Sequence, residues 1–374
     1  DGKIGTIFVS GSLIGASAAN SGTILSTGDM GAVRVNGDLV GAGGNESGEI
    51  RTSGKITGGL INGVFVGVTV GGSVIGGAGM QSGRIRANGD LPAIRIGRDL
   101  LGGSNSAAGQ IQSVGGTIAS VTVGGSLVGG SGLETGSLVS GSNIGPVRIN
   151  GSMEGGAGVH SGGINLDTQG NSTSVTIGGS IRSGSGALSG CICVNGVLGP
   201  VKVLGSLVGT VARPVVISGL GHLVLPATAT TDVGIKSLTV GGRVEFAQIL
   251  AGYQTDSSTV LTPANADAQI GAVVVGGDWI ASSIGAGVID GGNGFGNSGD
   301  AKITDPNDAP NIISKIGSIN IAGEVMGTVG GADHFGFVAE QISSLMVGGQ
   351  TIALTANKDV VNVGTTGDVA LQEI

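Results

Sequence analysis

The chain has 374 residues, of which 80 are glycine, 2% are aromatic and 11% are charged, and its formal net charge is −8. This acidic balance argues against nucleic-acid binding, which needs a basic stripe, and no apolar run is long enough to span a membrane. Hydrophobic residues make up 40% of the chain and recur two apart, so the glycines are typical of turns between short strands rather than of disorder.

A strand pattern of hydrophobic-x-hydrophobic, followed in most copies by a corner glycine, recurs along the chain. Its copies start at Ile7, Val33, Val68, Ile94, Val121, Val147, Val175, Val201, Leu238, Val273, Ile319 and Leu345. The steps between these starts are 26, 35, 26, 27, 26, 28, 26, 37, 35, 46 and 26 residues. A fixed period with occasional additions is typical of stacked repeats whose additions lie in loops.

One repeat, residues 121–147, shows the expected course of the chain. Val121 and Val123 point inward, two glycines turn the first corner, Leu127 points inward on a second side, and Leu138 does so on a third. Three short strands and three glycine-rich corners describe one rung. The sequence therefore predicts an all-β fold, a single-chain parallel β-helix of about 26 residues per rung. A rung of this length favours a right-handed coil.

The domain prediction is one continuous β-solenoid over 1–374. Its regular rungs occupy 1–208, rungs with long insertions occupy 209–318, and 319–374 form the C-terminal end. The insertions fall in 209–237, 245–272 and 280–318, with a shorter one near 55–66. Function in repeat proteins tends to lie on such segments, so we expect recognition there.

Stacking in register predicts ladders of equivalent side chains. The inward ladder through Val9, Val35 and Val70 is β-branched throughout, whereas the outward one alternates cations such as Arg34 with threonines such as Thr69. On the third side, Glu49 falls one rung from Arg84 as an opposite-charge pair. The corner glycine, found in eleven of the twelve copies with Arg98 as the exception, indicates positive φ or close backbone approach.

The run VTVGGSLVGGSG from Val121, followed by TGSL from Thr135, resembles the glycine-rich β-solenoid repeats of large bacterial surface and secreted proteins, such as haemagglutinin-like adhesins. The resemblance covers 1–208 well and the remainder only through the strand pattern. It implies an extracellular or cell-surface location and a structural or adhesive role.

The largest insertion is rich in oxygen-bearing side chains on a glycine-rich backbone. These are the ligands that Ca²⁺ prefers, so a calcium site is one hypothesis and a solvated polar loop the other. The candidate ligands are Asp290, Asn293, Asp300, Asp305 and Asp308. The stretch GGNGFG partly resembles a calcium-binding nonapeptide, but Gly296 stands where its aspartate would be. No other cofactor is expected.

The remaining candidates have structural interpretations. Trp279 stands where other rungs carry a core leucine, and we expect it in the core, with a carbohydrate platform as the alternative. The three histidines, His160, His222 and His334, have no metal spacing and are expected at the surface. Cys191 and Cys193 lie two apart on one strand, too far apart for an unstrained disulfide, and are expected as surface thiols.

No catalytic residues are identifiable, so the leading hypothesis is a non-enzymatic extracellular protein: a surface stalk, an adhesin module or a glycine-rich filament subunit. The alternatives are a polysaccharide lyase or hydrolase with its site in 209–318, and an ice-binding protein whose threonine ladder Arg34, Arg95 and Arg148 would interrupt. Strand patterns run to both ends, so we expect end-to-end self-association, or flanking segments of a longer chain that cover the ends. A surface glycan or protein is the other expected partner.

Overall fold

The computed structural model describes residues 2–61, 63–166, 168–255, 259–330, 333–355 and 358–374. No helix occurs within these ranges. The chain divides into two compact units, Asp1–Ile192 and Cys193–Ile374, here called unit 1 and unit 2, with the boundary inside β23 (Ile192–Val194). Each unit is a parallel β-helix, so the predicted fold class is confirmed.

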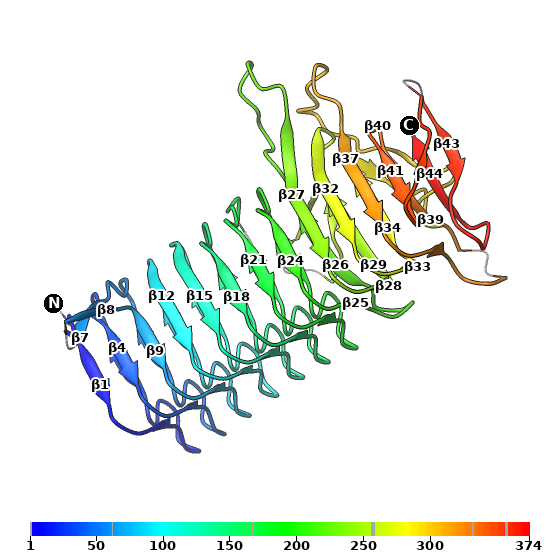
Figure 1. Ribbon diagram of the computed structural model, residues 1–374. Coiled ribbons are helices and arrows are strands. Elements are labelled where there is room, and N and C mark those ends of the chain that lie inside the picture. The colour runs from blue at the N-terminus through cyan, green and yellow to red at the C-terminus, as the bar shows by residue number, and fades with distance from the viewer. Residues whose placement is uncertain (1, 62, 167, 256–258, 331–332, 356–357) are drawn as a thin grey trace. The chain divides into compact units, whose positions relative to one another are not determined.

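Unit 1 contains three parallel sheets, one for each side of the rung (Figure 1). The first contains β1 (Ile7–Val9), β4 (Val33–Val35), β9 (Val68–Val70), β12 (Leu91–Ile96), β15 (Ile118–Val123), β18 (Val147–Ile149) and β21 (Val175–Ile177). The second contains β2 (Leu13–Ile14), β5 (Leu39–Val40), β10 (Val74–Ile75), β13 (Leu100–Leu101), β16 (Leu127–Val128), β19 (Met153–Glu154) and β22 (Ile181–Arg182). The third contains β3 (Ile24–Ser26), β6 (Ile50–Thr52), β11 (Ile85–Ala87), β14 (Ile111–Ser113), β17 (Leu138–Ser140) and β20 (Ile164–Leu166), and the insertion near 55–66 forms a hairpin of β7 (Gly59–Ile61) and β8 (Val64–Val66).

Unit 2 repeats the three sides with longer strands. Its first sheet contains β24 (Val201–Val203), β27 (Asp232–Val240), β32 (Ala268–Val275), β37 (Lys315–Ile321), β41 (Leu345–Val347) and the antiparallel β42 (Gln350–Ile352), with β40 (Gln341–Ile342) beside β37. Its second contains β25 (Leu207–Val208), β28 (Val244–Glu245), β33 (Trp279–Ile280) and β38 (Val325–Met326). Its third contains β26 (Val215–Gly219), β29 (Ala247–Ala251), β34 (Ser283–Ala286), β39 (Phe335–Ala339), β44 (Val369–Glu373) and the antiparallel β43 (Val360–Asn362).

The predicted ladders are confirmed within each unit. Val9 pairs with Val35 and Val35 with Val70, while Arg34 pairs with Thr69, so cations and threonines alternate on the outward face. The inward members from Val35 to Ile321 are fully buried, as the β-branched pattern requires, whereas Val9 in the first rung and Val347 in the last are half buried. In unit 2, Trp279 is fully buried, its indole N–H donates to the Ser282 carbonyl at 2.9 Å, and its ring lies 5.4 Å from that of Phe337. The core assignment of Trp279 is therefore confirmed.

Close approach, rather than positive φ, accounts for the corner glycines of the regular rungs. A Cβ on Gly125 would lie 2.1 Å from the Asp99 carboxylate, and one on Gly151 would lie 2.3 Å from the Ser126 hydroxyl. The same Asp99 Oδ1 accepts the Ser126 amide at 2.7 Å, and the Ser126 hydroxyl accepts the Ser152 amide at 3.1 Å. The alternating Asp and Ser side chains therefore bond each rung to the next, which leaves no room for a Cβ at the following corner.

The corner between the second and third sheets differs between the units. In unit 1 it is long, as in residues 129–137, and carries one non-glycine residue with φ between 50° and 60° in each rung: Asn20, Glu46, Gln81, Ala107, Glu134, His160 and Leu188. In unit 2 two rungs shorten it. Phe246 alone separates β28 from β29, with φ of 47°, and Ala281 follows β33 with φ of 43°.

The long corner of unit 1 lies over the outward face of the third sheet. Arg84 bonds the Gln81 side chain at 2.8 Å, and Gln110 bonds the Glu134 carboxylate at 3.1 Å. This cover explains two wrong expectations. His160, in the same corner position, is buried, and so are both cysteines. Neither Cys191 nor Cys193 forms a disulfide, and the Cys191 thiol donates to Asn165 Oδ1 at 3.2 Å.

Candidate functional site

The best-formed groove of unit 2 lies where the long corner is missing. Its volume is about 470 Å³. The floor is the outward face of the third sheet, where Gln248 of β29 pairs with Ser283 of β34. The walls come from the turn after β25, from the 290–295 loop and from the start of β39. The lining residues are Thr210, Val211 and Pro214, 246–248, Ala281 and Ser283, Asp290 and 292–295, and 333–335.

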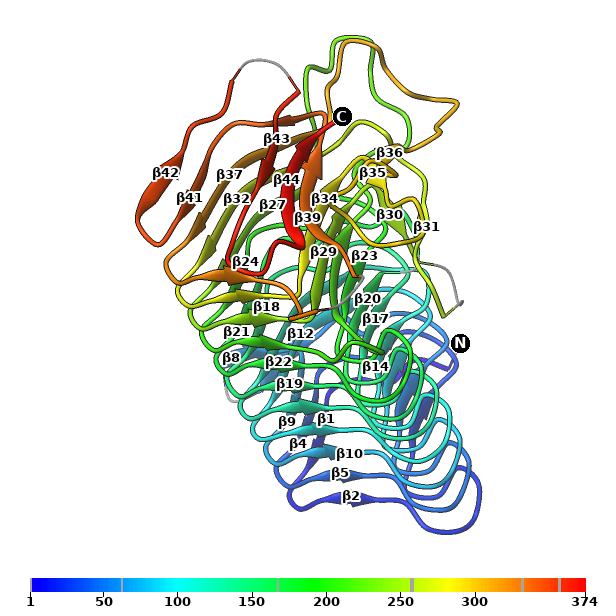
Figure 2. The ribbon, with the colours of Figure 1, turned by 90° about the vertical axis from the view of Figure 1, so that its right-hand side faces the viewer.

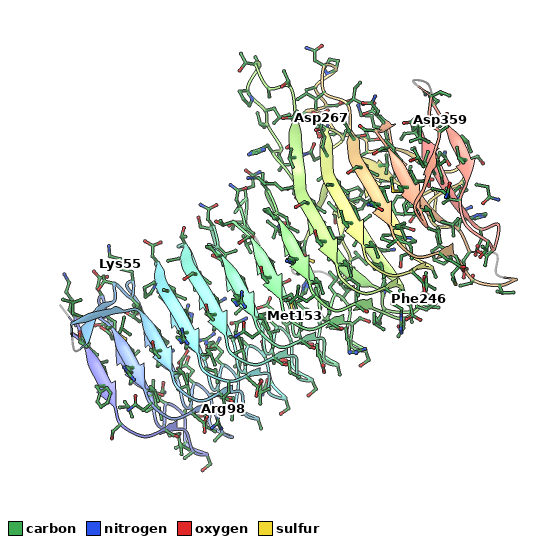
Figure 3. The ribbon with its side chains drawn as sticks, in the orientation of Figure 1. Lys55, Arg98, Met153, Phe246, Asp267 and Asp359 are labelled. Atoms are coloured by element: carbon green, nitrogen blue, oxygen red, sulfur yellow. The ribbon has the colours of Figure 1, made fainter. Side chains whose placement is uncertain are left out.

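Phe246 stands at the corner that opens this groove (Figure 3). Its φ of 47° lies in the left-handed region, where a bulky side chain is a conformational outlier. Its amide donates to the Ile280 carbonyl at 3.0 Å and its carbonyl accepts from the Val215 amide at 3.0 Å, so both rungs hold the backbone there. The half-buried ring is thus fixed at the rim of the groove.

The insertion between β34 and β37 is packed against unit 2 rather than protruding freely. It contains a hairpin of β35 (Val288–Ile289) and β36 (Ala301–Lys302), which lies near the hairpin of β30 (Tyr253–Gln254) and β31 (Thr262–Pro263) (Figure 2). Phe295 is 3% exposed and its ring lies against Gly285, where a Cβ would come within 3.2 Å. These segments form a second apolar cluster of Leu250, Tyr253, Ala266, Val288, Phe295, Ile303 and Val338.

The five predicted calcium ligands divide between two places. Asp290 and Asp300 lie near one another, and Asp290 and Asn293 line the groove. Asp290 Oδ1 accepts the Gly292 amide at 2.6 Å, and Asp300 Oδ2 accepts the Gly296 and Asn297 amides at 2.7 and 3.1 Å. Burial raises the pKa of Asp300. The two hydrogen bonds that Asp300 accepts hold the glycine-rich loop that positions Phe295.

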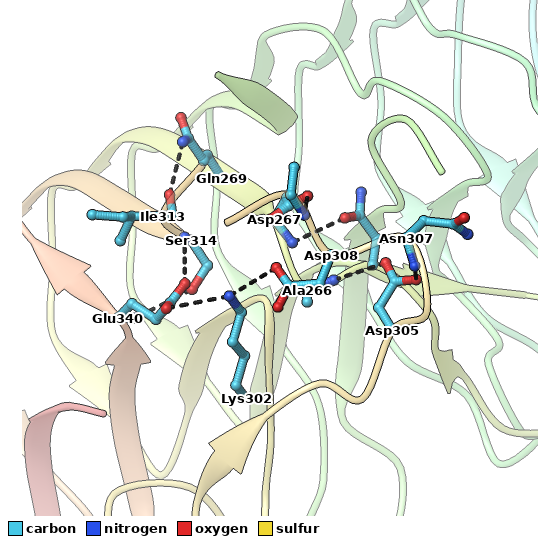
Figure 4. A network of polar contacts seen from close by, with 12 residues as sticks. Ala266, Asp267, Gln269, Lys302, Asp305, Asn307, Asp308, Ile313, Ser314 and Glu340 are labelled. Atoms are coloured by element: carbon cyan, nitrogen blue, oxygen red, sulfur yellow. Dashed lines mark hydrogen bonds and ion pairs between the residues drawn. The ribbon is translucent and has the colours of Figure 1, made fainter. Parts of the chain in front are cut away.

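Asp305 and Asp308 belong to a separate network (Figure 4). Asp305 Oδ1 accepts the Asn307 amide at 2.8 Å, and Asp308 Oδ1 pairs with Lys302 Nζ at 2.9 Å. In the part of the chain that the structure describes, no three Asp, Glu, His or Cys side chains gather closely enough to hold a metal ion. The five predicted ligands are thus divided between two networks, and the calcium site stays a prediction that has no part in the function proposed below.

The same network fixes the end of the insertion to the sheets of unit 2. Lys302 Nζ also pairs with Glu340 Oε1 at 3.3 Å, and Glu340 Oε2 accepts the Ser314 amide at 2.8 Å (Figure 4). Asp267, which is 2% exposed, accepts the Ala309 amide at 2.9 Å. Burial, reinforced by the neighbouring Asp308 and opposed by the Ala309 hydrogen bond, raises the pKa of Asp267 to about 6.

One further constellation escaped the sequence analysis. The His222 ring Nδ1 lies 3.2 Å from Oδ1 of the fully buried Asp232, whose Oδ2 accepts the Asn265 amide at 2.6 Å. Asn265 also donates to the Leu220 carbonyl at 2.8 Å. His222 remains half exposed, as expected of a surface histidine. Asp232 is the first residue of β27, whereas Asn265 lies three residues before β32, and no local motif links them.

Comparison with known proteins gives no family. No family model, no curated protein and no solved structure matches the chain. Within the ranges described, no helix is long and apolar enough to cross a membrane. The function is therefore inferred from the residues of the groove and from their geometry.

Proposed function

We propose that the protein is an extracellular structural and interaction protein, in which unit 1 is a scaffold and unit 2 presents a recognition groove. The observation that carries this is the contrast at the corner between the second and third sheets. In unit 1 the long corner covers the outward face of the third sheet, where Arg84 bonds Gln81 of one corner and Gln110 bonds Glu134 of another. Glu49 lies under the same cover and bonds Arg84. In unit 2 the shortened corner at Phe246 and Ala281 leaves that face open as a groove.

The resemblance to repeats of bacterial surface proteins supports an adhesive role for such a scaffold at the cell surface. A direct test is binding of the purified, fluorescently labelled chain to cell surfaces, with and without substitutions in the groove. Saturable binding that falls when Phe246 or Asp333 is replaced supports recognition by unit 2. Binding that depends on unit 1 surface residues alone would contradict this division of roles.

End-to-end assembly is the second part of this proposal. In the first rung the inward residues Ile7, Val9, Leu13 and Ile24 are only half buried, whereas their partners in the next rung are fully buried. An apolar core section with unpaired strand edges favours pairing with another rung, from a second copy or from a longer chain. At the other end, β42 and β43 run antiparallel to their neighbours, so a copy docking there would meet an antiparallel edge.

Sedimentation velocity over a range of concentrations tests the assembly. We expect oligomers that grow with concentration and that shrink when Phe8 and Leu25, both exposed in the first rung, are replaced by Glu. Glutamates there would face Arg34 and Arg51 of the next rung, so the fold should persist. Val114→Glu, at an exposed position elsewhere in unit 1, is the matched control. A stable monomer at high concentration would refute self-association.

A polysaccharide-active enzyme is the second candidate, because Asp290, Asp333 and His334 line one groove. Glycoside hydrolysis uses two carboxylates that flank the scissile bond. Release of reducing ends or unsaturated products from a polysaccharide panel, abolished by Asp290→Asn and by Asp333→Asn, would favour this candidate. Binding without product release favours the adhesive role.

A further inference from the structure

We infer that the groove of unit 2 binds an uncharged carbohydrate chain, with Phe246 as the stacking platform and Asp290 and Asp333 as acceptors for sugar hydroxyls. This inference rests on the proposed recognition role and names its ligand class. Four features of the groove carry it: the strained aromatic corner, the composition of the floor, the sign of the charges and the size of the cavity.

The first feature is backbone strain at Phe246. Glycine adopts a left-handed φ without strain, and a single-residue corner needs no side chain. The corner at Ala281, one rung further on, shows that a methyl group suffices structurally. A phenylalanine in this conformation keeps a half-buried ring at the rim of the groove despite the cost. Strained residues of this kind cluster at ligand sites because the fold over-determines their conformation.

The second feature is a floor of uncharged polar groups. Gln248 and Ser283 are neighbours on the outward face, and Ser283 Oγ already accepts the Gly336 amide at 3.2 Å. The side chains of Gln248, Asn293 and Asp333 make no hydrogen bond to any residue that the structure describes, so their donors and acceptors face the groove. Beside Ser283, the backbone of Gly296 lies directly over Gly336, where a Cβ would come within 2.6 Å, so the loop closes the groove on this side. Such a mixture of aromatic and hydrogen-bonding groups suits a sugar ring.

The third feature is charge. The ionisable side chains that line the groove are Asp290, Asp333 and His334, with no lysine or arginine among the lining residues. Two carboxylates repel an anionic ligand, so a polyuronate or a sulfated chain is disfavoured. Carboxylates accept strong hydrogen bonds from hydroxyl groups, which an uncharged glycan supplies in number.

The fourth feature is size. A volume of about 470 Å³ holds two or three sugar rings and falls within the range of small-molecule sites. The exposed lining residues Val211, Asn293 and Asp333 leave the groove open to solvent, which suits an internal stretch of a chain.

Calorimetry of the full chain against neutral hexasaccharides tests the inference. The panel comprises β-1,4-glucan, α-1,4-glucan, mannan, galactan and chitin oligomers, with oligogalacturonate and hexalysine as comparisons. We expect binding to at least one neutral hexasaccharide and none to oligogalacturonate. Phe246→Gly should weaken that binding at least tenfold while the thermal midpoint of unit 2, followed by Trp279 fluorescence, stays constant or rises.

Two controls separate contact from strain. Leu188→Gly relieves similar strain at a unit 1 corner (φ of 50°) that does not line the groove, and it should leave affinity within about twofold. Phe8→Ala removes an exposed ring in unit 1 and should leave the affinity for the oligosaccharide unchanged. Absence of binding to every neutral oligomer overturns the inference, as does preferred binding of oligogalacturonate or of hexalysine, the latter pointing to a basic protein partner. The proposed interaction role survives those outcomes if cell-surface binding persists, so the two failures are distinguishable.

Discussion

At the scale of single residues, the Glu49–Arg84 pair is the clearest case of a surface pattern that becomes part of the core. Arg84 Nη2 lies 2.8 Å from Glu49 Oε1, and both side chains are almost wholly buried. Burial raises the pKa of Glu49 and lowers that of Arg84, and the partner opposes each shift. Each side chain keeps its charge because the opposite charge of its partner compensates for the loss of water around it.

Removing one partner should therefore be costly. Glu49→Ala leaves a buried guanidinium whose remaining partner is Gln81, and we expect a loss of about 3–5 kcal/mol in the free energy of unfolding of unit 1. The double variant Glu49→Gln, Arg84→Gln should lose far less, because Gln110 already fills the equivalent position one rung on. Urea titrations followed by far-UV circular dichroism measure both. Equal losses in the single and double variants would contradict the pairing.

At the scale of the element, one hydroxyl holds the long corner in most rungs of unit 1, and Ala108 takes its place in one rung. Ser82 Oγ accepts the Gly77 amide at 2.9 Å and donates to the Gly79 carbonyl at 2.7 Å. Thr135, Ser161 and Ser189 make the same two bonds in later rungs. The Ser-Gly or Thr-Gly pair that precedes most third-side strands of unit 1 is therefore a structural signal, with Ala108-Gly109 before β14 as the exception.

Ser82→Ala should cost about 1–3 kcal/mol, because the partly buried Gly77 amide loses its acceptor. Ser131→Ala, at an exposed serine in a neighbouring corner, should change stability by less than about 0.5 kcal/mol. Thermal melts of unit 1 followed by circular dichroism compare the two. A tolerated Ser82→Ala would show that the corner is held by its backbone alone.

Features of the fold that repeat with the rungs could be predicted from the sequence, and features that do not repeat could not. Spacing two apart places Val9 and Val35 inward, and the strand pattern on either side of the insertion near 55–66 places Glu49 one rung from Arg84, so the rungs, the register and the charge pair followed from sequence. The burial of Cys191 could not be predicted in this way. The alternating pattern indicates an outward position for it, but the long corner of unit 1 covers that face of the third sheet. The groove did not follow either, because its walls come from segments more than 100 residues apart in the sequence.

The insertions show the same limit. Their composition indicated solvated loops, but Phe295 packs into the second apolar cluster. Its ring fits there because Gly285 has no side chain at the point of contact. Deleting 290–308 would expose Leu250 and Val338, so these residues support unit 2 as well as its groove.

The network that holds the insertion should make unit 2 sensitive to pH. The pKa of Asp267 is raised in the folded state, so the folded state binds the proton more tightly than the unfolded one. Its contribution to stability is therefore complete below the unfolded pKa of about 4 and is lost as pH rises through about 6. Asp267→Asn resembles the protonated form and should be more stable than the natural chain at pH 7.5 but not at pH 4.5.

Fluorescence of Trp279, the single tryptophan of the chain, follows unit 2 in that experiment. Asp359→Asn, at another carboxylate of unit 2, is the comparison. A pH dependence that is unchanged by Asp267→Asn would show that other carboxyl groups dominate.

At the scale of the whole molecule, we propose that unit 1 is the scaffold and that unit 2 recognises the ligand. In unit 1, polar side chains on the outward face of the third sheet bond the long corners that cover it. In unit 2, part of that face is left open as the groove, which aromatic, amide and carboxylate groups line. The charge on the chain, −8 overall, is consistent with the preference for an uncharged ligand at this groove.

Hydrogen–deuterium exchange of the full chain, with and without the tightest-binding neutral hexasaccharide, tests this separation most directly. The account predicts slower exchange at 210–214, 246–248, 290–295 and 333–335, and unchanged exchange throughout 2–192. Slower exchange confined to the rungs of unit 1, with the groove segments unchanged, would contradict it.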